Sequence, residues 1–137
     1  MNEYALSEIT VGLSEEFSVT LTAEMTAAFV AMGGDVNPLH IDQRYAEGKG
    51  FPGCVVHGML TSAFYSTLVG VYLPGRHSLL QGIKIAFHHP VFVGDRLTVR
   101  GEIAHVSEAA GVVTVRGSIA NQSGEMVSKA QIQVGFI

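Results

Sequence analysis

The chain has 137 residues, of which 47% are hydrophobic and 15% are charged, and its formal net charge is −4. This length and balance predict one domain over residues 1–137 with a sizeable core, and they exclude an intrinsically disordered chain. Lys and Arg form no cluster or stripe, so nucleic acid and an anionic membrane surface are not expected partners. The low charged fraction also favours a subunit interface on part of the surface.

Cysteine usage and the first residues bear on the cellular compartment. A single cysteine, Cys54, permits no internal disulfide and is typical of a reducing compartment. Residues 1–20 carry four glutamates and no Lys or Arg, which is unlike a secretory signal peptide. We therefore expect a cytoplasmic protein.

The first predicted elements lead into a short polar segment. Residues 15–20 predict a strand, and residues 23–32 predict a helix capped by Thr22. Gly33 and Gly34 suit the end of this helix. Its apolar side chains recur at helical spacing and form one stripe, which consists of Met25, Ala28, Phe29 and Met32.

The segment from Gly34 to His40 is the most informative part of the chain. Pro38 has no N–H and pushes Asn37 toward an extended conformation, so regular helix is not expected here. On a bent loop the carboxylate of Asp35 and the imidazole of His40 can converge, as an acid–base pair requires. We expect Asn37 to stabilise the loop through its side-chain amide, with a direct ligand contact as the alternative.

A stretch without any Asp, Glu, Lys or Arg runs from Gly50 to Gly75. A membrane span needs about 20 predominantly apolar residues, whereas polar residues interrupt this run and prolines bound it. We therefore predict a helix of a globular domain that begins at His57 or Gly58 and ends near Leu73. A short helical turn over residues 42–47 and a loop over residues 48–53 precede it. Apolar residues lie on most sides of the long helix, so we expect it to be buried nearly all round.

After residue 75 the hydrophobic pattern changes to a period of two. Four strands are predicted, over residues 79–87, 96–106, 112–120 and 125–136, with turn signals between them. Consecutive strands with short turns indicate an antiparallel meander. A helix that is apolar on most sides needs a sheet curled around it, so the predicted class is α+β, with an antiparallel sheet wrapped around a long central helix.

Three segments, taken in this order, resemble the MaoC-like (R)-specific enoyl-CoA hydratases, a branch of the hot-dog fold. Residues 34–40 resemble the hydratase motif of the family, Asp-x-Asn-Pro-Leu-His. Residues 56–60, Val-His-Gly-Met-Leu, resemble the start of its central helix. The third segment comprises Phe87, Pro90-Val91 and Gly94-Asp95. The order and spacing of the three segments, which lie between residues 34 and 95, make the resemblance specific to the family.

The resemblance implies a function and a set of site residues. The implied reaction adds water to trans-2-enoyl-CoA and gives the (R)-3-hydroxyacyl-CoA. The family's catalytic aspartate and histidine map onto Asp35 and His40, an oxyanion-hole donor maps onto Gly58, and a serine near the aspartate maps onto Ser66. The resemblance also implies a homodimer with one continuous sheet, an active site near the subunit interface, and an acyl-CoA thioester as substrate. No metal or redox cofactor is implied, since coenzyme A is part of the substrate.

The residues themselves suit this chemistry. Hydration of an unsaturated thioester needs an activated water at C3, a proton for C2 and stabilisation of an enolate-like oxygen. Carboxyl and imidazole groups titrate at about 3.9 and about 6.5 in unstructured peptides. Asp35 is therefore expected to act as the base on a water that His40 orients, and His40 is expected to assist proton transfer. Which group protonates C2 is left open.

Gly58 is expected at the start of the long helix, where backbone N–H groups lack partners within the helix. Such donors and the helix dipole favour negative charge that develops on a thioester oxygen. The alternative interpretation is that a glycine at this position only lets the helix pack tightly.

Other polar residues are weaker candidates. His88 and His89 are expected side by side in a strand, where they would face opposite ways and could not chelate one metal ion. We expect His57 to be a hydrogen-bonded structural residue and not a second base. Cys54 is expected to be a small apolar filler, and Asp95 a turn residue.

Three alternative functions follow from the same residues. A metal bound by Asp35, Asn37 and His40 is a minor option, because one short loop would supply all three ligands. A hot-dog acyl-CoA thioesterase would aim the water at the carbonyl carbon instead of C3. A non-catalytic acyl-CoA-binding module would not require the Asp35–His40 pair. The sequence leaves open the acyl chain length, CoA against a carrier protein, assembly beyond a dimer, and the pathway, with polyester monomer supply and fatty-acid metabolism as options.

Overall fold

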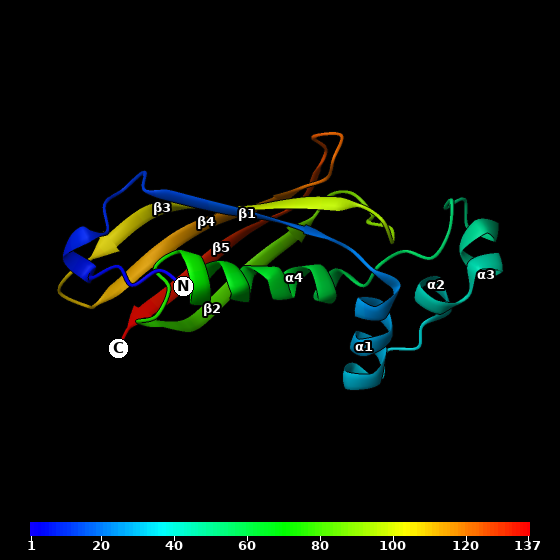
Figure 1. The fold of residues 1–137 in the computed structure, drawn as a ribbon, viewed down its shortest axis with the longest axis horizontal. Helices are drawn as coiled ribbons and strands as arrows, with labels where there is room; N and C mark the ends of the chain where they lie inside the picture. Colours follow the sequence, from blue (N-terminus) through cyan, green and yellow to red (C-terminus); the bar gives the residue numbers. More distant parts are fainter.

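The computed structural model describes residues 1–137, and Figure 1 shows one sheet with a long helix beside it and three helices at one end. The helical elements are η1 (Leu6–Glu8), α1 (Ala23–Gly33), α2 (Pro38–Ile41), α3 (Gln43–Gly48), α4 (Gly58–Thr67) and η2 (Leu68–Tyr72). The strands are β1 (Ser14–Thr20), β2 (Ser78–Phe87), β3 (Arg96–Ser107), β4 (Val112–Ala120) and β5 (Met126–Phe136). The five predicted strands are thereby confirmed, as are the helix predicted over residues 23–32 and the helical turn predicted over residues 42–47.

The five strands form one antiparallel sheet in the order β1-β3-β4-β5-β2. The predicted meander is confirmed for β3, β4 and β5. It is wrong for β2, which does not pair with β3 but lies at the sheet edge beside β5. The connection from β2 to β3 contains Pro90, whose missing N–H breaks a strand ladder, and it carries the chain across the sheet.

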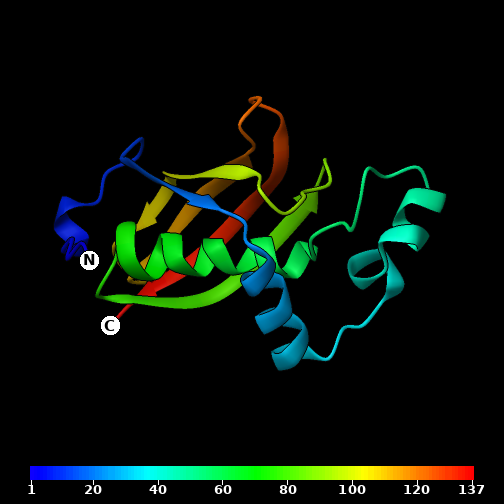
Figure 2. The same cartoon turned by 45° about the vertical axis from the view of Figure 1, so that its right-hand side comes forward.

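One continuous helix, made of α4 and the π-helical η2, runs along one face of the sheet (Figures 1 and 2). Strand glycines let it approach closely. A Cβ atom on Gly117 would lie 2.6 Å from Cε1 of Tyr65, and one on Gly101 would lie 2.8 Å from Cδ2 of Leu68. The core cluster of 18 buried residues fills the space between this helix and the sheet. The helix position, and with it the start of α4, is therefore fixed by the packed interior.

Tyr65 adds a polar anchor to this contact. Its hydroxyl lies 2.9 Å from Oγ of Ser128, and both side chains are fully buried. Burial raises the pKa of the Tyr65 phenol to about 12, above the value of about 10 that tyrosine has in an unfolded chain. The stabilisation from the neutral phenol is therefore complete below about pH 10 and lost as the pH rises toward 12.

The prediction that the long helix is buried nearly all round is wrong for the single chain. Thr61, Ser62 and Tyr65 are buried, but Met59 is 64% exposed and Ser66 is also exposed. The reason is that the sheet covers one side of the helix only, so the opposite side stays open. No helix in the uncharged stretch, or elsewhere, has the length and apolar character needed to cross a membrane.

The segment with α1, α2 and α3, residues 23–48, projects beyond the end of the sheet (Figures 1 and 2), and we call it the helical arm. Thr22 caps α1 as predicted, because its Oγ1 accepts a hydrogen bond of 3.3 Å from the Met25 N–H. Despite its apolar stripe α1 has no buried residue, and Met32 is 78% exposed. The arm thus contributes little to the core, and its residues remain available for a site.

Candidate active site

A cavity of about 570 Å³ opens at the end of the sheet, where α4 begins beside the helical arm. Segments far apart in the sequence supply its walls: the arm, the start of α4, the end of β2 and one residue of β5. Its polar lining residues include Asp35, His40, His57, Thr61, His88 and His89. The cavity therefore collects both residues that the sequence singled out for proton transfer, Asp35 and His40.

Asp35 is held on the connection between α1 and α2. Gly34 ends α1 with a φ of 71°, a left-handed conformation that glycine adopts without strain, and its N–H donates to the Val30 carbonyl over 2.8 Å. Oδ1 of Asp35 then accepts a hydrogen bond of 3.1 Å from the Asn37 N–H. Oδ2 accepts no hydrogen bond from the protein, although Nε2 of His57 lies 3.9 Å away, and the side chain is 52% exposed. One carboxylate oxygen is thus anchored while the other is free to meet water.

The sequence predicted an irregular loop around His40, but this residue lies on the one-turn helix α2. Pro38 was the reason for predicting no helix here, but it occupies the start of α2, where its missing N–H is not needed. Asn37 caps the turn, since its Oδ1 accepts a hydrogen bond of 3.0 Å from the Leu39 N–H. The Asn37 side chain therefore stabilises this segment, as expected, by capping α2. Asp35 and His40 nevertheless come together as the motif predicted.

The backbone fixes which nitrogen of His40 carries the proton. Nδ1 lies 2.6 Å from the carbonyl oxygen of Val55. Because a carbonyl oxygen only accepts, Nδ1–H is the donor in this bond. In the neutral ring the lone pair therefore belongs to Nε2, which is left to accept a proton.

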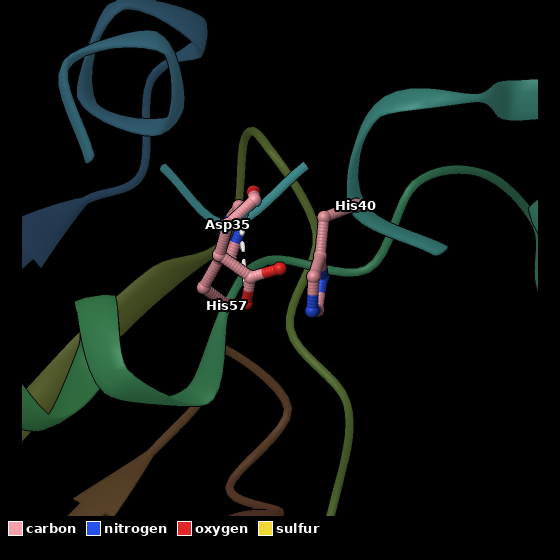
Figure 3. Close-up of side chains that lie close together, drawn as sticks. All are labelled: Asp35, His40 and His57. Carbon is pink, nitrogen blue, oxygen red and sulfur yellow. Dashed lines mark hydrogen bonds and ion pairs between the residues drawn. The ribbon is translucent and has the colours of Figure 1, made fainter. Parts of the chain in front are cut away.

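Asp35, His40 and His57 lie together where α1, α2 and α4 approach one another (Figure 3). One carboxylate oxygen and one nitrogen of each ring all lie within 4.8 Å of one another. A water that donates hydrogen bonds of about 2.8 Å to two acceptors spans a gap of this size. Such a water, held by the Asp35 carboxylate and His40, would keep its own lone pairs free to attack a substrate.

His57 contacts both Asp35 and His40, which the sequence did not indicate. Its ring stacks on that of His40, with centroids 3.9 Å apart and an angle of 28° between the planes. Nε2–H donates a hydrogen bond of 3.0 Å to the backbone carbonyl of Asp35. The expectation of a hydrogen-bonded residue is confirmed, and the structure adds that only 2% of His57 is exposed. Its partners lie far away in the chain, so no local pattern revealed them.

The N–H groups of Gly58 and Met59 begin α4 at the wall of the cavity, and neither has a hydrogen-bond acceptor in the chain. Hydroxyls of Thr61 and Ser62 both donate to the Gly58 carbonyl over 2.8 Å, which fixes this first turn. A Cβ atom on Gly58 would lie 3.0 Å from Cε1 of Phe87. Both interpretations of Gly58 therefore have support: it presents a free donor, and it packs closely against a ring.

The three grouped side chains could in principle bind a metal ion through one oxygen and two nitrogens. One contact opposes this use, because Nε2 of His57 already donates to the Asp35 carbonyl, whereas the lone pair of His40 Nε2 stays free. Because the two rings are stacked, their in-plane lone pairs also do not converge on one point. The geometry suits a water better than a metal ion.

The remaining candidates differ in where the fold places them. Ser66 lies on the exposed side of α4 and does not line the cavity. His88 and His89 both line it, and the expectation that they lie side by side in a strand is wrong. Their strand ends at residue 87, shortly before Pro90. Asp95 is a turn residue as expected, because its Oδ2 accepts a hydrogen bond of 2.9 Å from the Phe92 N–H.

Comparison with known proteins gives a consistent group of relatives. The model of the MaoC like domain matches residues 7–123. An (R)-specific enoyl-CoA hydratase of Aeromonas caviae is 37% identical over 116 residues, which cover 85% of this chain and 87% of the relative. An enzyme of the same description from Rhodospirillum rubrum is 27% identical over 127 residues, which cover 93% of this chain and 88% of the relative.

Solved structures show the same fold. The (R)-hydratase from A. caviae that is involved in PHA biosynthesis superposes with a TM-score of 0.89 at 34% identity, covering 94% of this chain and 98% of that one. An unliganded R-hydratase from Pseudomonas aeruginosa also reaches 0.89, at 29% identity, covering 96% of this chain and 84% of that one. The predicted hot-dog fold, an antiparallel sheet with a long central helix, is thereby confirmed.

Proposed function

The chain belongs to the MaoC-like domain family, and on that premise we propose that it adds water to trans-2-enoyl-CoA to give (R)-3-hydroxyacyl-CoA. The stereochemical part follows the activity named for the relatives. The observation that carries the proposal is the pairing of Asp35 and His40 at one cavity, beside the unpaired N–H of Gly58.

The proposed mechanism assigns one task to each group. Asp35 takes a proton from the water that it holds together with His40, and the water oxygen attacks C3. The electron pair of the double bond shifts toward the thioester carbonyl, whose oxygen gains negative charge beside the Gly58 N–H. A proton that balances the one taken by Asp35 then adds to C2, so that one water molecule is added in total and Asp35 is again a carboxylate. No electrons are exchanged with a second reactant, so we propose that no redox cofactor takes part, and we assign the proton transfer to Asp35 and His40 without a metal ion.

Purified protein and crotonyl-CoA test this function directly. We expect the enoyl absorbance to disappear without release of free thiol, and chiral analysis to identify the (R)-3-hydroxyacyl product. Release of free thiol would instead identify a thioesterase. Tight binding with neither change would identify an acyl-CoA-binding module, and either result would overturn the proposal.

Replacing Gly58 with proline tests the oxyanion donor. Proline removes the N–H at the first position of α4, which tolerates proline, and His57 already has the extended conformation required before one, with φ −55° and ψ 128°. We expect kcat for hydration to fall by about 10²–10³, as for other single donors. Gly58→Ala is the matched control, because it adds the Cβ atom near Phe87 but keeps the N–H. If both variants lost activity equally, crowding and not the donor would explain the loss.

We also propose that two copies join through β2 into one continuous sheet. β2 lies at the sheet edge, where its backbone has no further partner strand. It exposes large apolar side chains, with Leu79 50%, Leu80 41%, Ile83 41% and Phe87 51% exposed. Phe87 also lines the cavity, so a partner docked on this edge would lie next to the site. This arrangement supports the expected homodimer.

Light scattering on purified protein measures the assembly. We expect a mass of twice the 14.6 kDa of one chain, and we expect Leu79→Lys to shift the equilibrium toward the single chain, because lysine disfavours edge pairing. A single-chain mass for the unsubstituted protein would contradict the dimer. A single cysteine fits a reducing compartment, so the cytoplasm remains our proposed location.

A further inference from the structure

The proposed hydration mechanism assigns no role to His57, a buried residue at the site. His57 is 2% exposed, precedes α4, and lies between the rings of Phe29 and His40, with centroid distances of 4.9 Å and 3.9 Å. The same side chain bonds the backbone carbonyl of Asp35. A single rigid ring therefore contacts both members of the proposed acid–base pair.

Neither nitrogen of His57 is available to the substrate, because one is hydrogen-bonded and the other is buried. Nε2 carries a proton, because its partner, the Asp35 carbonyl oxygen 3.0 Å away, can only accept. Nδ1 is buried and has no hydrogen-bond partner. A buried polar atom without a partner costs free energy, about 1–3 kcal/mol, so a residue of this kind needs a compensating reason to be present. An apolar ring would fill the space without that cost, but it could not bond the Asp35 carbonyl.

We propose that His57 is a positioning residue for the hydration, an inference that rests on the proposed function. Its Nε2–H holds the backbone of Asp35, and its ring face holds the plane of His40. The two contacts together set the gap across which the Asp35 carboxylate and Nε2 of His40 share one water. Displacing a reacting group by about 1 Å can reduce turnover by about 10²-fold, so a loss of either contact should be visible in kcat.

Two substitutions separate the two contacts. His57→Gln keeps an N–H near the position of Nε2 but removes the ring that stacks on His40. His57→Phe keeps a ring but removes the donor to the Asp35 carbonyl. We expect each to lower kcat with crotonyl-CoA by about 10- to 100-fold and to change KM by less than about threefold, because neither contact involves the thioester. His105→Gln, on the exposed surface of β3, is the matched control and should retain full activity.

A double-mutant cycle distinguishes positioning from a general structural role. In a His40→Asn background the stacking partner is gone, so adding His57→Gln should lower kcat no further. If the two losses multiply, or if His57→Gln has the kcat of the unsubstituted protein, the proposal is overturned. A His57→Gln variant that no longer folds, as judged by circular dichroism, would place His57 in the scaffold and would overturn it too.

The proposed function and this inference fail in different ways. An unsubstituted protein that does not hydrate crotonyl-CoA defeats the function. An active unsubstituted protein whose His57 variants match it in kcat defeats only the role of His57.

Discussion

Asp35→Asn is expected to lower kcat for hydration of crotonyl-CoA by about 10²–10⁴, the range that a positioned acid–base group contributes. Asparagine has the same shape as aspartate and keeps the Oδ1 that accepts the Asn37 N–H. It cannot take a proton from water near neutral pH. The loop should therefore keep its conformation while the base is lost.

Thermal unfolding provides the control for this variant. The Asp35 side chain is 52% exposed, accepts one hydrogen bond from a local N–H and lies 3.9 Å from Nε2 of His57, so the melting temperature should change little, as for most surface substitutions. Turnover equal to that of the unsubstituted protein would remove Asp35 from the mechanism. A large drop in melting temperature would make the loss of activity uninformative about proton transfer, and the Asp35→Glu variant would then separate charge from fold.

The second large effect is expected at His40, where two substitutions separate the roles of its two ring nitrogens. His40→Asn places an amide N–H where Nδ1–H now donates to the Val55 carbonyl, but it has no atom at the position of Nε2. We expect kcat to fall by about 10²–10⁴ with little change in KM, measured by steady-state kinetics with crotonyl-CoA.

His40→Gln gives the complementary result. Its side-chain amide can reach the water from the position of Nε2 and orient it, but it cannot accept a proton. A loss as large as that of His40→Asn would show that His40 transfers a proton. Activity largely retained in His40→Gln would show that His40 only orients the water. Full activity in both variants would contradict any role for His40.

The elements of the fold were predictable because their signals are local. The alternation of apolar residues over 96–107 and 112–120, and the capping residue Thr22, depend on neighbours a few positions away. The place of β2 beside β5 was not predictable in this way, since it depends on where the chain goes after Pro90. The extent of burial of α4 depends on which of its sides the sheet covers.

The same difference between local and long-range signals explains which parts of the site were predictable. The convergence of Asp35 and His40 followed from a motif of a few residues, although the sequence rules indicated a loop where α2 forms. The contact of His57 with Asp35 joins residues 22 positions apart and has no local signature. The one available signal was its place directly before Gly58. The single domain over residues 1–137, the homodimer and the absence of a cofactor stay predictions.

The helical arm carries Asp35 and His40, the proposed acid–base pair, on a segment outside the core cluster. α1 has no buried residue, whereas the core cluster of 18 buried residues draws mainly on the sheet and the long helix. Segments with few buried contacts open at a lower free-energy cost than the whole fold. Mild heating should thus abolish activity while the core is still folded. Substitutions in the arm can also accumulate during evolution without destabilising the core.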